Sequence, residues 1–207
     1  MNYNQIRNEL KTGDIVLFSG KNHISDLIKW ASRGPWSHVG MIVRVAEYDM
    51  VMLWESTTLS NVKDWIDQKY ISGVQLVSLT ERLCKYNGDV AVRLLNQPLS
   101  VEQKERLAAL RRQLRGRPYE QNKLELIKSA YDGPLGTNHV ENLQSIFCSE
   151  QVAEAYQRMG LLAEPPVGLP SNEYTPVDFS TAARQLLPLL APYELGEEIP
   201  LTLRAAA

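Results

Sequence analysis

Short apolar runs separated by turn-forming residues dominate the first half of the chain. These runs are rich in β-branched and bulky residues and cover residues 14–18, 36–45, 50–55, 73–79 and 89–95. Runs of this kind, bounded by Gly, Pro, Ser or Asp, indicate buried strands. The turn-like segment 46–49 between the second and third runs predicts an antiparallel hairpin. The pattern therefore predicts an antiparallel sheet of about five strands, largely covered on both faces.

Other segments place their apolar residues at helical spacing. They cover residues 23–32, 61–69, 100–116, 121–130, 147–159 and 178–187. Ser100 and Gln103 form a capping-box signature at the start of the third segment, and Gly160 follows the fifth. Together, the runs and the helical segments predict an α+β fold in which helices pack on the sheet.

Length and the distribution of proline define the expected domain organisation. A chain of 207 residues fits one domain of ordinary size. Seven of the 11 prolines follow Gly160, which predicts mostly extended chain wrapped on the domain. We expect one domain over residues 1–187 and a proline-containing tail over residues 188–207.

The composition excludes several classes of protein. The net charge of −2 provides no basic field that would attract nucleic acid, so no nucleic-acid partner is expected. The two cysteines, Cys84 and Cys148, are too few for a disulfide framework, and no apolar stretch approaches the ~20 residues of a membrane span. These features predict a cytoplasmic protein with reduced thiols, and they leave the oligomeric state open.

Positive charge is concentrated in one predicted helix. Arg111, Arg112 and Arg115 accompany an apolar stripe that includes Leu110 and Leu114. Such a cluster is expected to form the solvated face of its helix. The alternative is a peripheral contact with lipid headgroups or another anion.

Cys148 stands at the start of a predicted helix, on the face that carries Val152, Ala155 and Tyr156. Unpaired N–H groups and the helix dipole at that position stabilise a thiolate and lower the pKa of a thiol. Taken alone, without a partner, the residue is better interpreted as a small buried hydrophobe.

His38 and Glu55 supply the candidate partners. His38 lies inside an apolar strand, where its ring must be hydrogen-bonded or functional. Glu55 ends the next strand, and two hairpin registers place it on the same face as His38. In the first register the two residues lie directly opposite each other. In the second, His38 lies opposite Thr57, and Glu55 is its diagonal neighbour. A register shifted by a single residue would separate them.

A thiol, an imidazole and a carboxylate are the components of a nucleophilic site. The carboxylate would orient the ring, the ring would take the thiol proton and later protonate the leaving group, and the helix start would stabilise the oxyanion. The same three residue types also ligate zinc, but structural zinc sites use four ligands with short paired spacings, and Cys84 has no such spacing. We therefore expect neither a metal nor a cofactor.

Five short motifs, in this order, resemble a known family. They are Gly13–Phe18, Trp36–Val43, Gly116–Glu120, Phe147–Glu150 and Thr175–Asp178. They resemble the YiiX-like group of circularly permuted NlpC-type, papain-fold thiol hydrolases, which are related to lecithin-retinol acyltransferase-like proteins. The family's Pro-Tyr motif commonly continues with Asp, whereas this chain has Glu120.

The resemblance implies a permuted papain-like fold in which the histidine strand precedes the nucleophile helix. It implies Cys148 as nucleophile, His38 as general base, Glu55 as the residue that orients His38, and Tyr119 as a residue that lines the site or assists the oxyanion. The expected activity is hydrolysis or acyl transfer at an amide, ester or thioester bond of a peptide or acyl-lipid substrate. The alternative is a papain-fold module that binds such a ligand without turning it over.

Overall fold

The computed structural model describes residues 1–118 and 148–203, and within them the chain forms one antiparallel sheet of six strands in the order β4-β3-β2-β1-β5-β6. The strands are β1 (Ile15–Gly20), β2 (His38–Val45), β3 (Met50–Thr57), β4 (Gly73–Ser78), β5 (Gly88–Arg93) and β6 (Ile199–Pro200). Five of them correspond to the predicted runs. The sixth is a two-residue strand from the C-terminal segment, too short to leave a periodic signal in the sequence.

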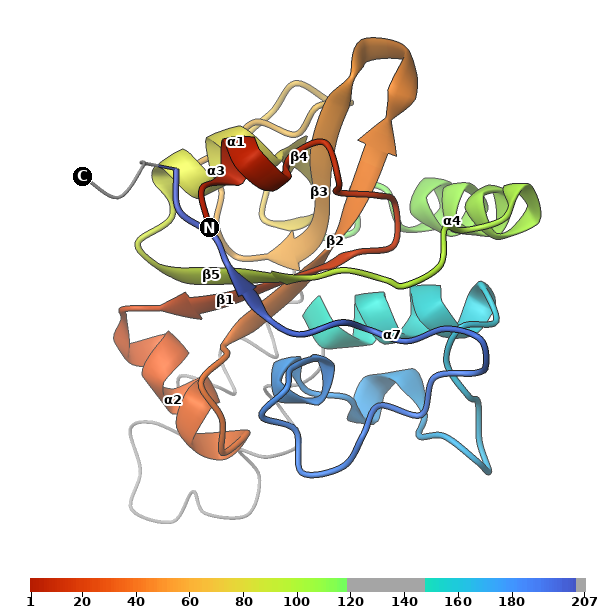
Figure 1. Cartoon of the computed structure of the whole chain (residues 1–207). Coiled ribbons are helices and arrows are strands. Elements are labelled where there is room, and N and C mark those ends of the chain that lie inside the picture. The colour runs from red at the N-terminus through yellow and green to blue at the C-terminus, as the bar shows by residue number, and fades with distance from the viewer. Residues whose placement is uncertain (119–147, 204–207) are drawn as a thin grey trace.

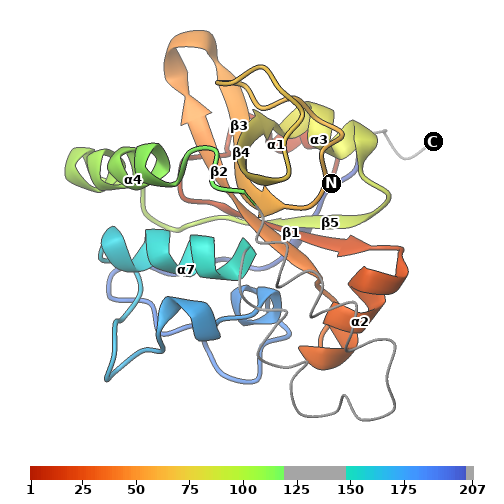
Figure 2. The same ribbon diagram turned by 180° about the vertical axis from the view of Figure 1, so that it is seen from behind.

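Helices cover both faces of this sheet (Figures 1 and 2). α4 (Val101–Leu114) and α7 (Cys148–Arg158) pack with Val39, Met41 and Trp54 on one face. α1 (Tyr3–Ile6) and α3 (Leu79–Lys85) pack with Ile42 and Leu53 on the other. Because side chains alternate along a strand, β2 and β3 contribute to both layers of the core.

Side-chain caps fix where the helices begin. Ser100 and Gln103 form the predicted capping box of α4. The Asn22 side chain accepts a hydrogen bond from Ser25 N at the start of α2 (His23–Ala31), and the Ser78 hydroxyl accepts one from Glu81 N in α3. The cap at Ser78 ends the predicted strand 73–79 one residue early and begins a helix that the apolar pattern did not reveal.

The predicted helix over residues 61–69 is wrong. The buried carboxylate of Asp64 accepts hydrogen bonds from the backbone N–H groups of Ile66 and Asp67, and its other oxygen accepts one from Leu76. These bonds hold the segment as a turn beside β4, because an aspartate that binds its own following N–H groups competes with the helix.

The helix predicted near residues 178–187 is also wrong. Only a 3₁₀ turn over Pro176–Phe179 forms, and the Ser180 hydroxyl then donates to the Val177 carbonyl and accepts from Ala182 N, which ends the helical geometry. The helix predicted over 121–130 lies outside the described residues.

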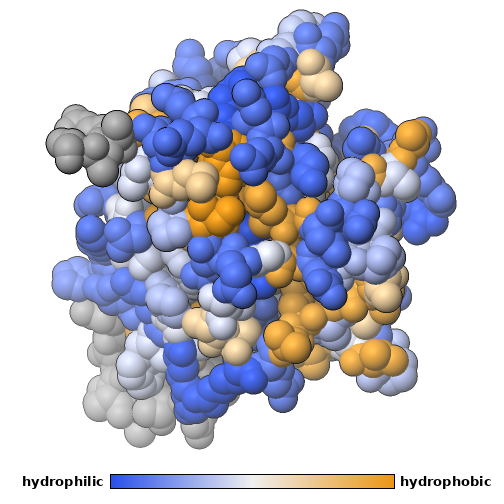
Figure 3. All heavy atoms as spheres, in the orientation of Figure 1, coloured by the Kyte–Doolittle hydropathy of each residue, from blue (hydrophilic) through white to orange (hydrophobic). Residues whose placement is uncertain are grey.

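The segment after α7 is tied to the sheet. The guanidinium of Arg93 donates to the carbonyls of Phe179, Leu195 and Gly196, and β6 pairs with β5. On the face shown in Figure 3, apolar side chains gather from the centre toward the lower right. Within the segment after α7, Leu186 and Leu190 are exposed. Within the described part of the chain, no helix combines the length and the apolar character needed to cross a bilayer.

Candidate active site

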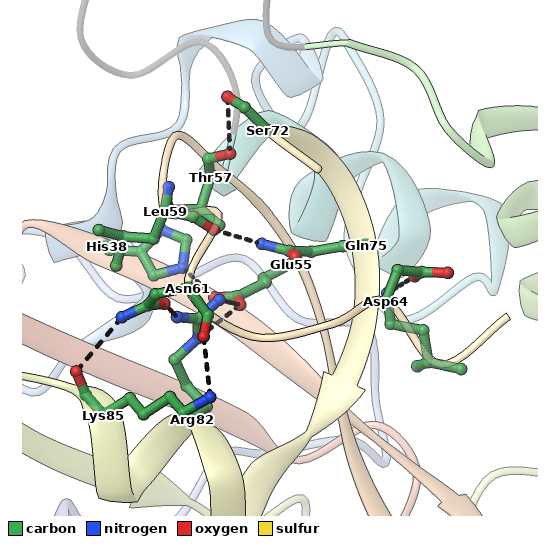
Figure 4. A network of polar contacts seen from close by, with 11 residues as sticks. His38, Glu55, Thr57, Leu59, Asn61, Asp64, Ser72, Gln75, Arg82 and Lys85 are labelled. Carbon is green, nitrogen blue, oxygen red and sulfur yellow. Dashed lines mark hydrogen bonds and ion pairs between the residues drawn. The ribbon is translucent and has the colours of Figure 1, made fainter. Parts of the chain in front are cut away.

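His38 and Glu55 meet through the register of the β2–β3 hairpin. Met41 pairs with Trp54, and the same register continued sets Gly40 opposite Glu55 and His38 opposite Thr57. This is the second of the two predicted registers, in which the imidazole and the carboxylate are diagonal neighbours. The Nε2 atom of His38 lies 2.7 Å from Oε2 of Glu55, in a contact with a fully buried carboxylate (Figure 4).

Cys148 approaches His38 from α7, which packs on the sheet face opposite α3. It begins α7 as described and is 8% exposed, and its sulfur is hydrogen-bonded to the His38 ring and to the backbone N–H groups of Val39 and Ser149. Because Nε2 of His38 is occupied by Glu55, Nδ1 is the ring nitrogen left for the thiol.

The electrostatics favour a thiolate–imidazolium pair. Burial alone would raise the pKa of the Cys148 thiol, but the His38 ring and the two backbone N–H groups outweigh it and lower the pKa. Burial likewise opposes charge on His38, yet Cys148 and Glu55 together raise its pKa to about 9. Each group therefore favours the charged form of the other.

The second oxygen of Glu55 is held by a buried arginine. Arg82 donates from Nε to Oε1 at 2.8 Å, its Nη2 lies 2.6 Å from the same oxygen, and its Nη1 donates to Asn61 Oδ1 at 2.5 Å (Figure 4). Burial raises the pKa of Glu55, but Arg82 and His38 lower it below its usual value. The sequence analysis missed Arg82 and Asn61. The one available signal was that Arg82 lies at i+3 from Leu79, on the same face of α3.

A cleft of about 420 Å³ opens beside Cys148 and His38. Its other described lining residues are Asn22, His23, Ile24, Ser25, Ile28, Ser37, Ser56, Thr57, Thr58, Leu59 and Tyr86. They come from α2 and its N-cap, from the residue before β2, from the end of β3 and the two residues after it, and from the residue after α3. Burial raises the pKa of Tyr86 to about 12, so its hydroxyl, hydrogen-bonded to the Ser37 side chain, stays protonated at neutral pH.

The remaining predicted residues lie elsewhere. Tyr119 is outside the described residues. Arg111, Arg112 and Arg115 line a separate hollow of about 250 Å³ beside α4 and β4, where Arg115 pairs with Asp67. Among the described residues, no group of three or more His, Cys, Asp and Glu side chains is arranged to hold a metal ion.

The fold and the site together define a class. A cysteine at a helix start, hydrogen-bonded to a histidine of an antiparallel sheet that is oriented by a polar residue, is the arrangement of papain-like proteins. Here the histidine strand precedes the cysteine helix in the chain. The chain belongs to the family described as "Permuted papain-like amidase enzyme, YaeF/YiiX, C92 family", which matches residues 9–169. The predicted YiiX-like resemblance and the circularly permuted papain-like fold are thereby confirmed.

Two individual proteins are also similar to this chain. The "Uncharacterized protein R372" of Acanthamoeba polyphaga mimivirus is 33% identical over 113 residues, which are 47% of this chain and 44% of that protein. The chain therefore aligns with less than half of this relative. A crystal structure titled "metalloprotein yiiX from Escherichia coli O157:H7, DUF1105" is 22% identical with a TM-score of 0.47, over 72% of this chain and 66% of that one.

Proposed function

We propose that this protein is a cysteine amidase that works through an acyl-enzyme on Cys148. The observation that supports the proposal most directly is the continuous hydrogen-bonded series from the Cys148 thiol through the His38 ring to the buried Glu55 carboxylate. Membership of a papain-like amidase family supports the same class of reaction.

In the first half of the reaction, the Cys148 thiolate attacks the carbonyl carbon of an amide. The negative charge on the carbonyl oxygen develops near the start of α7, where the helix dipole favours it. His38 then donates its proton to the departing nitrogen, the C–N bond breaks, and a thioester to Cys148 remains.

In the second half, a water molecule attacks the thioester carbonyl while His38 takes its proton. The C–S bond breaks, the carboxylic acid leaves, and Cys148 is released as a thiolate while His38 keeps the proton from water, so the thiolate–imidazolium pair is restored. An amine or alcohol in place of water would give acyl transfer, and ester or thioester substrates would use the same first step.

The cleft supports an uncharged, partly apolar acyl group. Ile24, Ile28 and Leu59 provide aliphatic surface, and Thr57 and Thr58 provide hydroxyls beside it. None of the described residues that line the cleft is Asp, Glu, Lys or Arg. A short fatty acyl chain or a peptide with an aliphatic side chain matches this chemistry.

Both cysteines are free thiols, which supports a reducing compartment such as the cytoplasm.

Intact-mass spectrometry of acyl adducts tests the proposal. A Cys84→Ser background leaves Cys148 as the one thiol of the chain. We expect aryl amides or thioesters of aliphatic acids to add one acyl group, the Cys148→Ala variant to add none, and the His38→Ala variant to acylate at least tenfold more slowly. Absence of any adduct, together with an ordinary alkylation pKa of ~8.5 for Cys148, would overturn the enzyme and favour a module that only binds its ligand.

A further inference from the structure

Arg82 lies directly behind the candidate catalytic residues without touching the cleft. Its side chain is fully buried, it comes from α3 on the sheet face opposite α7, and it does not line the cleft beside Cys148. Its Nε and Nη2 atoms converge on Oε1 of Glu55, which leaves Oε2 free to face His38 (Figure 4). The arginine therefore determines which oxygen of the carboxylate meets the imidazole.

The charges on the α3 side of the sheet explain why such a partner is needed. The side chain of Glu55 is fully buried, and a buried carboxylate without a compensating cation would take up a proton. Among the residues that the structure describes, the charged groups that face it are His38 from β2 and Arg82 from α3. Gln75, opposite Glu55 on β4, is neutral and donates to the Leu59 carbonyl. Arg82 is thus the permanent positive charge beside Glu55.

Asn61 fixes the direction of the arginine. Its Oδ1 accepts from Nη1 of Arg82, and the Lys85 ammonium donates to the Asn61 backbone carbonyl. The guanidinium is therefore held from both sides, by Glu55 and by the turn that follows β3.

We propose that Arg82, oriented by Asn61, is a positioning residue that keeps Glu55 ionised and aimed at His38, and so sets the reactivity of Cys148. The inference rests on the proposed function, because it concerns the same cysteine, but it assigns a role to a residue outside the reacting groups. Without Arg82, Glu55 is protonated more readily, His38 loses the anion that favours its charged form, and Cys148 loses part of the stabilisation of its thiolate.

The test is the pH dependence of Cys148 alkylation by iodoacetamide in the Cys84→Ser background. We expect the Arg82→Met variant to shift the inflection of the rate upward by about one pH unit, and the Arg82→Lys variant, which keeps the charge, to recover at least half of that shift. Asn61→Ala should give a smaller shift in the same direction. In Glu55→Gln, adding Arg82→Met should produce no further shift, because the charge that Arg82 compensates is already absent.

The double variant also addresses folding, because it removes the carboxylate that Arg82→Met alone would leave uncompensated. Arg93→Met is the matched control: it removes a partly buried arginine whose hydrogen bonds within the described residues all go to backbone carbonyls, and it should leave the inflection unchanged. A profile that Arg82→Met leaves unchanged, or shifts equally with and without Glu55, would overturn the role of Arg82. An ordinary thiol profile in the unsubstituted protein would instead overturn the proposed function.

Discussion

Glu55 reaches His38 across a position that has no side chain. Gly40 lies opposite Glu55 in the hairpin register, and a Cβ atom there would lie 2.7 Å from Leu53 Cδ1, 3.2 Å from the Trp54 carbonyl oxygen and 3.3 Å from Glu55 Cβ. The diagonal contact between imidazole and carboxylate therefore depends on the glycine two residues after the histidine.

Gly40→Ala should consequently disturb the site as well as the fold. We expect a loss of about 1–3 kcal/mol in the free energy of unfolding, because backbone and buried side chains must shift to accept the methyl group. The displaced Glu55 should also slow Cys148 alkylation near pH 7 several-fold. Chemical denaturation and the alkylation rate measure the two effects.

Gly160→Ala is a suitable control for that substitution. Gly160 has φ of +71° with no atom near its Cβ position, so alanine there strains the backbone without crowding a neighbour. It should destabilise the protein by roughly 1 kcal/mol and leave the alkylation rate unaltered. Equal alkylation rates in the Gly40→Ala variant and the parent would contradict the steric account.

Neutralising Glu55 should lower the free energy of unfolding by more than the loss of one charge suggests. Glu55→Gln leaves the fully buried guanidinium of Arg82 without its counter-ion, which destabilises folded proteins by about 3–5 kcal/mol. The substitution should also lower the pKa of His38, because the carboxylate that favours the imidazolium is gone. Denaturation and an NMR titration of the histidines, assigned with His38→Ala, measure both effects.

Asp49→Asn provides the comparison for an exposed carboxylate. Asp49 pairs with Arg7 and Arg44 at the surface, where solvent screens the interaction. Little change in stability or in the histidine titration is expected. If Glu55→Gln also changed neither the stability nor the histidine titration, the buried contacts of Glu55 with Arg82 and His38 would not contribute to stability as their geometry implies.

The sequence alone was enough to predict the principal strands and the three residues that meet at the site. The buried runs indicated five strands. Because successive side chains of a strand point to opposite faces, only two of the registers considered for the hairpin place His38 and Glu55 on the same face. A choice between those registers depends on how the turn at 46–49 closes, where Asp49 adopts positive φ. That conformation is a property of the folded hairpin that the residue types alone did not specify.

The burial of Arg82 could not be predicted from the pattern of apolar and polar residues. Its helix is short, Leu79 is the one leucine on its buried face, and an arginine in a short helix usually indicates a solvated face. The residue is buried because Glu55, 27 positions earlier in the chain, supplies the opposite charge. A pairing of this kind forms only when tertiary structure brings the two residues together, so the local sequence around Arg82 does not identify Glu55 as its partner.

Asp14 should make stability fall as the pH rises through the weakly acidic range. Burial raises the pKa of this carboxyl to about 6, above its unfolded value, despite hydrogen bonds from the backbone of Lys11 and Leu95. Because the pKa of Asp14 is higher in the folded protein, its carboxyl ionises first in the unfolded chain. The contribution of Asp14 to the free energy of unfolding is therefore greatest below pH ~4 and is lost progressively up to pH ~6.

The corresponding experiment compares the unsubstituted protein with Asp14→Asn between pH 4 and 6.5. The difference between their free energies of unfolding should change by up to roughly 3 kcal/mol, with the unsubstituted protein gaining as the pH falls. Other titrating groups are common to both proteins and cancel in the difference. A constant difference across this range would mean that the Asp14 carboxyl keeps its ordinary acidity in the folded protein.

The aliphatic wall of the cleft should select among reagents that differ only in chain length. Ile24 lines the cleft and is 44% exposed, whereas Ile66, in the turn before β4, is 45% exposed and does not line it. We expect N-hexyl iodoacetamide to alkylate Cys148 about tenfold faster than iodoacetamide, because each methylene that leaves water contributes up to ~0.8 kcal/mol. Ile24→Ser should reduce that ratio several-fold, and Ile66→Ser should preserve it, as measured by intact mass in the Cys84→Ser background. A ratio near one in the parent, or an equal loss in both serine variants, would show that the acyl group is bound elsewhere than along α2.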